Sequence, residues 1–263
     1  MNDTLANNLS KIKLNVTELN AKKNISEEES FLQLRPTRVT SYRHTYLSIS
    51  DNVCGEDDTA FLIMLCLTHP DNRIKRNTIR QTWGSLARTK IWPLANTTFS
   101  GIKLVFLLGT NKNSYTTQTD IDQEIAQFGD IVQNDFVDSY YNLTRKVLVG
   151  FGWVKGFCPK TAFVLKVDDD MFIHIPNLVT YLHKIKVPPQ GSIIGRRNSP
   201  SPNVIRRGKW KVSFEEVPLS KYPVYVFGPA YVISGNLVAR LYNAVERMPY
   251  VSIEDAFITG AYE

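Results

Sequence analysis

Nearly continuous apolar runs alternate along the chain with segments of mixed polarity. Three such runs, Ala60–Thr68, Ile102–Leu108 and Phe163–Val167, have the length of strands and little polar alternation, which is typical of strands buried on both faces. Further strands are predicted at 131–133, 192–195, 224–227 and 231–234, helices at 72–83, 120–128, 142–155, 177–186 and 237–247, and a loop or ribbon at 200–211. Strands that alternate with helices indicate an α/β domain in which helices flank a mainly parallel central sheet.

Residues 1–50 differ from the rest, because their apolar residues are isolated among Asn, Ser, Thr, Lys and Glu. Such a segment buries too little surface to offset its ordering entropy, so we interpret it as a disordered linker with at most a weak helix near Leu5–Leu19. We therefore divide the chain into a polar stem, residues 1–55, and one domain, residues 56–263, with a compact part that begins near Ala60.

Four of the six Asn-x-Ser/Thr sequons lie in this stem. The six occur at Asn2, Asn8, Asn15, Asn24, Asn96 and Asn142. A sequon is glycosylated only in the secretory pathway. The sequence alone leaves two interpretations open: a secretory glycoprotein, or coincidence in a tail rich in Asn, Ser and Thr.

The overall composition is that of a globular protein. Of 263 residues, 43% are hydrophobic and 21% are charged, which excludes a disordered chain, a collagen-like repeat and a coiled coil. The net charge of +6 fits an anionic ligand, but no basic helix accompanies it, so nucleic-acid binding is not expected. The longest apolar run, Phe61–Leu67, is far shorter than the roughly 20 residues of a membrane span. With its polar start, the printed chain is expected to contain neither an anchor nor an export signal.

The three cysteines are too few for a disulfide-rich scaffold. Cys66 lies in an apolar run and is predicted to be a buried thiol. Cys54 and Cys158 are a possible pair, but their spacing does not decide the matter. Without a Cys-x-x-Cys motif, a zinc ribbon is not expected.

Three consecutive carboxylates, Asp168, Asp169 and Asp170, directly follow a predicted buried strand. Ligands of parallel sheets bind beyond the carboxyl ends of the strands. A divalent cation would relieve the repulsion between the three charges, and short Asp side chains suit Mg²⁺ or Mn²⁺. In an extended segment Asp168 and Asp170 point to one side, so we predict that they bind a metal that holds a diphosphate. A solvated acidic turn is the alternative.

A second acidic pair, Glu254 and Asp255, follows an apolar stretch near the end of the sequence. One of these carboxylates could act as a general base on a hydroxyl group. A favourable charge at a helix N-terminus is the alternative, and it is the better explanation if the pair is considered alone.

Basic residues gather in two places. Arg76 and Arg80 share a face of a predicted helix and are either phosphate ligands or part of a solvated face. Six further cations form either a solvated rim or a contact surface for an acidic acceptor; they are Arg196, Arg197, Arg206, Arg207, Lys209 and Lys211.

Five segments, in the same order along the chain, resemble the β-1,3-galactosyl/N-acetylglucosaminyltransferases, glycosyltransferase family 31. The family patterns and the matching residues are R-x-x-I-R-x-T-W-G at 76–84, D-F-x-D-S-Y-x-N-L-T-x-K at 135–146, K-x-D-D-D at 166–170, Y-P-x-Y…G-x-G-Y-V-x-S at 222–234 and E-D-V-Y-x-G at 254–260. The resemblance covers the chain from about residue 60 to its end.

This resemblance implies a GT-A-like fold and an inverting transfer of galactose or N-acetylglucosamine from a UDP-sugar to the 3-hydroxyl of a glycan acceptor. The cofactor would be Mn²⁺ or Mg²⁺. The acceptor would be carried by a glycoprotein, a glycolipid or a proteoglycan. Family members are usually type II Golgi membrane proteins with a lumenal domain, and the stem with its sequons fits that arrangement.

The resemblance also assigns roles to single residues. Asp255 would be the catalytic base, and Glu254 would support it or contact the acceptor. Asp168 and Asp170 would bind the metal. The candidates for contact with the nucleotide sugar are Arg76, Arg80, Lys146, Asp168 and Asp169.

The chain departs from the family pattern in ways that keep an alternative open. Val226 stands where the family usually has Cys, so a family disulfide is absent there and Cys158 is left without that partner. The C-terminal end of the domain is expected to be incomplete. The alternative function is therefore a non-catalytic nucleotide- or glycan-binding protein of the same fold.

Overall fold

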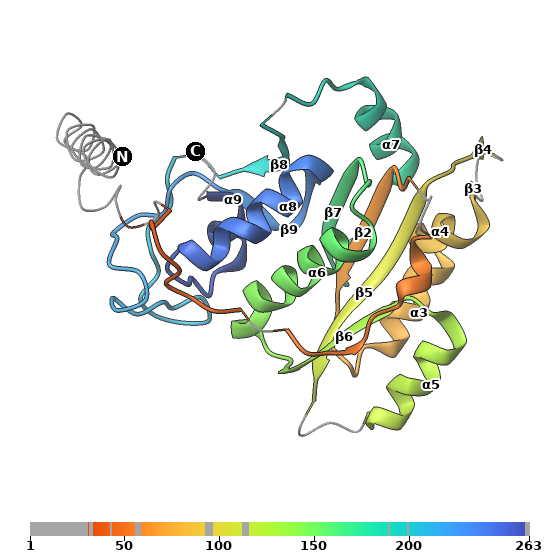
Figure 1. Cartoon of the computed structure of the whole chain (residues 1–263), viewed down its shortest axis with the longest axis horizontal. Coiled ribbons are helices and arrows are strands. Elements are labelled where there is room, and N and C mark those ends of the chain that lie inside the picture. Colours follow the sequence, from red (N-terminus) through yellow and green to blue (C-terminus); the bar gives the residue numbers. More distant parts are fainter. Residues whose placement is uncertain are drawn as a thin grey trace, which may run out of the picture.

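The computed structural model describes residue 31 and residues 34–42, 44–55, 59–92, 97–111, 116–188, 190–198 and 200–260. In this part of the chain a seven-stranded sheet forms the centre of the molecule (Figure 1). Its strands are β1 Tyr46–Ser48, β2 Leu62–Leu67, β5 Ile102–Thr110, β6 Ile131–Val137, β7 Phe163–Asp168, β8 Ile193–Arg197 and β9 Val226–Ser234. Their order is β1-β6-β5-β2-β7-β9-β8. Strands β6, β5, β2 and β7 are parallel neighbours, and antiparallel strands complete both sides.

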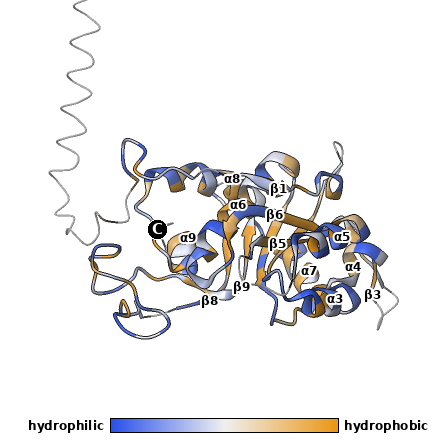
Figure 2. Cartoon of the chain, turned by 90° about the horizontal axis from the view of Figure 1, so that it is seen from below, coloured by the Kyte–Doolittle hydropathy of each residue, from blue (hydrophilic) through white to orange (hydrophobic). Residues whose placement is uncertain are grey.

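Helices cover both faces of this sheet. They are α3 Arg73–Gln81, α4 Leu86–Thr89, α5 Gln118–Phe128, α6 Leu143–Phe157, α7 Ile175–Lys184, α8 Gly235–Ala244 and α9 Glu254–Gly260. Even-numbered residues of β2 pack with α3, α5 and α7, whereas its odd-numbered residues pack with α6, α8 and α9. Figure 2 shows these apolar strands between helices whose outer surfaces are more polar. A continuous apolar run thus becomes a strand with two buried faces, as the sequence predicted.

Short elements complete the described chain. Strands β3 Ile91–Trp92 and β4 Thr97–Thr98 form a separate two-stranded sheet. Four 3₁₀ turns are η1 Asp51–Val53, η2 Trp83–Ser85, η3 Tyr140–Asn142 and η4 Val245–Arg247. The first helix was expected to continue to Gly84, but it ends at Gln81 and is followed by η2.

Two glycines explain local details of the helices. Gly129 adopts a left-handed conformation, φ 63°, and ends α5 where the sequence predicted. Gly150 lies inside α6, where glycine lowers helix propensity. A Cβ atom at this position would lie 2.6 Å from a Leu107 methyl group of β5, so the missing side chain allows α6 to pack closely on the sheet.

The predicted boundary of the stem is wrong in its last part. β1 pairs with β6 and is an edge strand of the main sheet. The backbone N–H groups of Arg35 and Val39 donate to the carbonyls of Arg247 and Glu246 at 2.8 and 2.9 Å. Residues 34–55, where described, therefore belong to the domain, because their backbone groups are paired with it. The helix expected near residues 5–19 lies outside the described residues.

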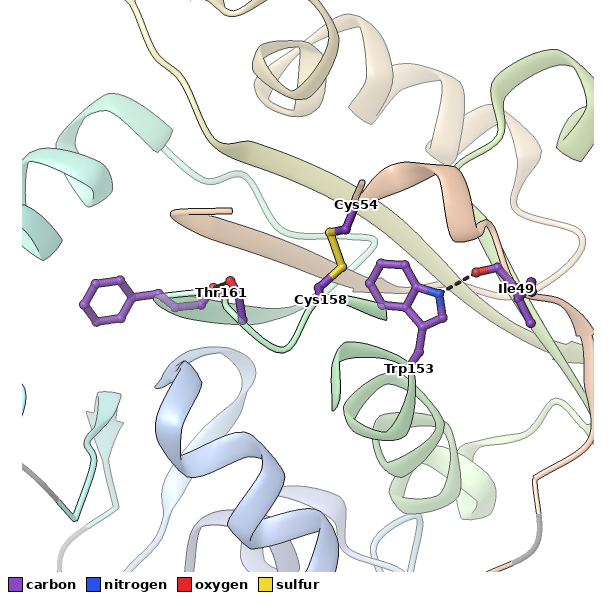
Figure 3. The surroundings of a disulfide bond; sticks show 6 residues. Ile49, Cys54, Trp153, Cys158 and Thr161 are labelled. Atoms are coloured by element: carbon purple, nitrogen blue, oxygen red, sulfur yellow. Dashed lines mark hydrogen bonds between the residues drawn. A yellow bond between two sulfur atoms is a disulfide. The ribbon is translucent and has the colours of Figure 1, made fainter. Parts of the chain in front are cut away.

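A disulfide fastens this N-terminal segment to the far end of α6 (Figure 3). Cys54, just after η1, is bonded to Cys158, which follows α6. Beside it the indole Nε1 of Trp153 donates to the carbonyl of Ile49. Cys158 therefore has a partner other than the one that the family pattern places at position 226, and the pairing left open by the sequence exists. Cys66 is a buried free thiol, as predicted.

None of the helices that the structure describes combines the length and the hydropathy needed to cross a bilayer.

Removal of the disulfide should destabilise the fold. Because the bond closes a separation of 104 residues, we expect the double variant Cys54→Ser/Cys158→Ser to lose about 3–5 kcal/mol of unfolding free energy. Urea unfolding followed by circular dichroism measures this loss. A reductant should lower the midpoint of the wild type towards that of the variant and leave the variant unchanged. Equal midpoints for the two proteins would contradict the prediction.

Candidate active site

A buried ammonium group organises the carboxyl end of β7. Lys166 donates to Oδ1 of Asp168 at 2.7 Å and to the carbonyl of Gly228 at 2.6 Å, and its Nζ lies 3.3 Å from Oε2 of Glu254. Burial disfavours its charge, but the carboxylates of Glu254 and Asp168 outweigh this effect and raise the pKa of Lys166. One cation thus joins residues of β7, β9 and α9.

Glu254 is a buried carboxyl group on the first turn of α9. The hydroxyl of Tyr231 donates to its Oε1, and Lys166 lies beside its Oε2. Burial raises the pKa of Glu254 to about 7, with Lys166 opposing the shift. Because both oxygens already have partners within the protein, the geometry favours a supporting role for this side chain.

Asp255, the next residue, is held by backbone groups. Its Oδ2 accepts from the N–H of Gly228 and its Oδ1 from its neighbour Ala256, both at 2.9 Å. Burial raises the pKa of Asp255, although these two N–H groups oppose the shift. The side chain is only partly buried and so remains open to a ligand.

Both ends of this network line one cavity of about 460 Å³. Asp168 and Asp255 face the same space although 87 positions separate them in the sequence. Aromatic side chains form much of the remaining wall: Tyr140, Trp210, Tyr222, Tyr225 and Phe227. Carboxylates thus lie beside flat apolar surfaces, a combination that suits a polar ligand with apolar faces.

The other two aspartates of the cluster do not line this cavity. Asp169 accepts from the hydroxyl of Thr68 at 2.8 Å, the amide of Asn72 at 2.7 Å and the ammonium of Lys75 at 2.8 Å. It thereby ties the segment after β7 to the start of α3. Asp169 and the exposed Asp170 line a second cavity of about 330 Å³. The expectation of an extended segment with Asp168 and Asp170 on one side is therefore wrong, because β7 ends at Asp168 and residues 169–170 form a turn.

The donor set fits a hard divalent cation that shares its ligands with a substrate. Among the described residues, no three His, Cys, Asp or Glu side chains form a closed metal cluster. Mg²⁺ is commonly held by one or two carboxylates and completed by substrate phosphates. Burial raises the pKa of Asp168, and the charges of Asp170 and Asp169 contribute to this shift against Lys166. A cation beside Asp168 and Asp170 would stabilise their ionised forms.

Arg76 and Arg80 lie away from the cavity, in a buried ion-pair cluster. Arg76 binds both oxygens of Glu124 at 2.9 and 2.7 Å. Arg80 binds Glu124 at 2.7 Å and both oxygens of Asp130 at 2.8 and 2.7 Å. Burial alone would raise the pKa of Glu124, but the two guanidinium groups outweigh it and lower that pKa. This arrangement corrects the expectation that these arginines are free for donor phosphates, because carboxylates already bind them.

Lys146 is also engaged in the interior. Its ammonium lies 2.6 Å from both oxygens of Asp138 and donates to the carbonyl of Thr68 at 2.9 Å. Burial lowers the pKa of Lys146, while Asp138 opposes this effect. Asp138 also accepts from the N–H of Gly109, so this pair joins the ends of β2, β5 and β6. Its contacts are structural, and it does not line the cavity of Asp255.

Sequence reasoning missed several residues of the site. The motif at 166–170 gave no role to Lys166. A Lys in a buried strand nevertheless needs a partner, so its presence there already indicates a buried ion pair. Tyr231 and Gly228 gave no comparable signal, because their role follows from the antiparallel pairing of β9 with β7.

Comparisons with known proteins identify relatives of this sequence. The galactosyltransferase family model matches residues 74–262. Lactosylceramide 1,3-N-acetyl-beta-D-glucosaminyltransferase of Xenopus tropicalis is 38% identical over 229 residues, which are 85% of this chain and 59% of that protein. Beta-1,3-galactosyltransferase 5 of Homo sapiens is 34% identical over 233 residues, which are 87% of this chain and 72% of that protein. The chain therefore spans less than two thirds of the length of the first relative and more than two thirds of the length of the second.

The Arg76–Arg80–Glu124 cluster should serve stability. Replacing Glu124 by Gln leaves two buried guanidinium groups with too little negative charge, so we expect a loss of about 3–5 kcal/mol of unfolding free energy. Chemical denaturation measures it. Asp122→Asn, an exposed change on the same helix, should leave the midpoint in place. A Glu124→Gln protein as stable as the wild type would contradict the structural role of this cluster.

The shifted pKa of Glu254 predicts a pH dependence of stability. The folded protein protonates this group at higher pH than the unfolded chain, so the resulting stabilisation is complete below pH about 4.5 and is lost as the pH rises through about 7. Relative to Glu254→Gln, the wild type should lose on the order of 3 kcal/mol across this range. Urea unfolding at a series of pH values tests the effect. A constant difference between the two proteins would argue against it.

Proposed function

The chain belongs to the galactosyltransferase family, and on that premise we propose that it transfers galactose or N-acetylglucosamine from a UDP-sugar to the 3-hydroxyl of a glycan. The product would be a β-1,3 linkage, formed with inversion at the anomeric carbon. One observation carries the proposal: Asp168, at the end of β7, and Asp255, at the start of α9, line a single cavity. A donor site and a base are therefore within reach of the same ligand.

Asp168 and Asp170 would hold Mn²⁺ or Mg²⁺ together with the diphosphate of the donor. Bound there, the cation would offset the negative charge that develops on the departing UDP. Lys166 fixes one oxygen of Asp168, so this carboxylate is oriented before a ligand arrives. Asp169 acts indirectly, because its contacts with Thr68, Asn72 and Lys75 position the segment that carries the two ligands.

Asp255 would take the proton of the acceptor hydroxyl. As the proton moves to the carboxylate, the acceptor oxygen forms a bond to the anomeric carbon, and the electron pair of the bond to phosphate leaves with UDP. The raised pKa of Asp255 makes it a stronger base than an exposed Asp, and the N–H groups of Gly228 and Ala256 fix its orientation. A single displacement of this kind inverts the anomeric centre and needs no covalent enzyme intermediate.

Two observations support the proposal of a Golgi lumenal enzyme. The Cys54–Cys158 disulfide fits an oxidising compartment. The sequons, Asn142 among them, fit a glycoprotein. The membrane anchor of such an enzyme would precede the stem.

Loss of the base should affect turnover more than donor binding. We expect Asp255→Asn to lower kcat by about 10²–10⁴-fold with a small change in the KM for the donor. The assay supplies UDP-galactose or UDP-N-acetylglucosamine, Mn²⁺ and a β-galactoside acceptor. Asp51→Asn, an exposed change on η1, is the matched control and should keep its rate. Equal rates for Asp255→Asn and the wild type would exclude the base. UDP binding without transfer by the wild type would favour the non-catalytic alternative.

A further inference from the structure

A two-armed ribbon, residues 202–222, extends from the body beside α9 and β8 (Figures 1 and 2). Its arms are paired. Asn203 and Lys221 form an antiparallel β-bridge, and the N–H of Val204 donates to the carbonyl of Ser220 at 2.9 Å. Farther out, the N–H of Val212 donates to the carbonyl of Ile205 at 2.9 Å, and residues 208–211 form the turn. The ribbon therefore has a defined tip, residues 205–214.

The tip exposes large apolar side chains between cations. Ile205, Trp210 and Phe214 are 44%, 53% and 65% exposed. Arg207, Lys209 and Lys211 are exposed among them. From residue 171 to residue 214 the sequence contains no Asp or Glu. The tip thus combines a positive charge with large apolar side chains that are about half exposed.

Arg206 stabilises the backbone of the ribbon. Its guanidinium group donates to four carbonyls, those of Val212, Ser213, Val217 and Leu219, at 2.6 to 3.0 Å. It also lies 3.9 Å above the ring of Phe214. With its backbone fixed in this way, the ribbon can present the tip without ordering it first, which favours binding.

The inner surface of the same ribbon is a wall of the active-site cavity. Ile205, Lys209 and Trp210 line the cavity that holds Asp255, and each of them is also exposed to solvent. A surface that covers the tip therefore lies at the entrance of the site.

We propose that the tip of this ribbon docks on a lipid membrane with anionic headgroups, and that the acceptor is a glycan carried by a lipid of that membrane. This inference rests on the proposed function and selects one acceptor class for it. Trp and other large apolar side chains partition to the headgroup region, and each Lys or Arg near an anionic surface strengthens binding about fivefold. The exposed cations of the tip, Arg207, Lys209 and Lys211, supply the charge complementarity.

Trp210 offers a native reporter of this contact. Of the four tryptophans in the chain, Trp83, Trp92 and Trp153 are buried, and Trp210 is half exposed. The purified full chain is mixed with vesicles of phosphatidylcholine, with or without phosphatidylserine. We expect co-sedimentation with the anionic vesicles, a blue shift of the emission, and quenching by brominated lipid. Binding without blue shift or quenching, or no binding to either vesicle, would overturn the proposal.

Matched variants separate the tip from general surface properties. Arg207→Gln/Lys211→Gln should weaken vesicle binding about 25-fold, since two charges are lost. Lys184→Gln/Lys186→Gln removes two exposed charges near the end of α7 and should leave binding within about twofold if the tip is the contact. Phe214→Ser should weaken binding, whereas Tyr181→Ser, a 51% exposed ring on α7, should not. Equal losses in the tip and control variants would contradict the assignment.

Turnover distinguishes this proposal from the proposed function. Arg207 and Lys211 do not line the cavity, so their double variant should keep the wild-type rate on a soluble oligosaccharide and lose rate on the same glycan anchored in anionic vesicles. Equal rates of variant and wild type on the anchored glycan would overturn the membrane contact and leave the transfer activity intact. Vesicle binding by a chain that transfers no sugar to either acceptor would instead refute the function, and with it the acceptor class, while the membrane contact stands.

Discussion

The site depends on the need of one buried ammonium group for oxygen partners. Lys166 lies in an interior strand, where an unpaired charge is strongly unfavourable. Its three partners come from β7, β9 and α9, so its charge is satisfied only when these elements meet. Since Gly228 offers its carbonyl to Lys166 and its N–H to Asp255, one residue links Asp255 to the ammonium group that binds Asp168. The same network therefore fixes the orientation of Asp168 and of Asp255.

The remaining buried charges serve the frame around this network. The arginines of α3 are bound by carboxylates of α5 and the segment after it, and Lys146 of α6 is bound by Asp138 beyond β6. These pairs join α3 to α5 and to the residue before β6, and α6 to the segment after β6. Ligand-facing and structural charges are thus close in space, and only burial and partnership distinguish them. At the cavity, the partly buried Asp168 and Asp255 are the carboxylates that remain open to a ligand.

The ribbon and the disulfide show how segments outside the sheet are fixed. Neither has a large apolar core of its own. The guanidinium of Arg206 organises the ribbon by binding carbonyls, and Glu216 joins it to the segment before α9 by accepting from the N–H of Ser252 at 2.5 Å. The N-terminal segment is fixed by Cys54 and by the pairing of β1 with β6. The ribbon that forms part of the cavity wall is therefore fixed by polar contacts, whereas the N-terminal segment is held by a covalent bond and by strand pairing.

The sequence by itself determined the layers of the fold and the location of the carboxylates, because these depend on local patterns. An apolar run such as 163–167 can be buried only as a strand or a core segment. The cluster Asp168–Asp170, which directly follows that run, must then lie at the edge of the sheet. The tertiary structure alone decided which charges are free. The partner of Arg76 lies 48 positions away at Glu124, and that of Cys158 lies 104 positions away at Cys54. A residue's own neighbours in the chain carry no information about such distant partners, because burial and pairing arise only when the layers come together.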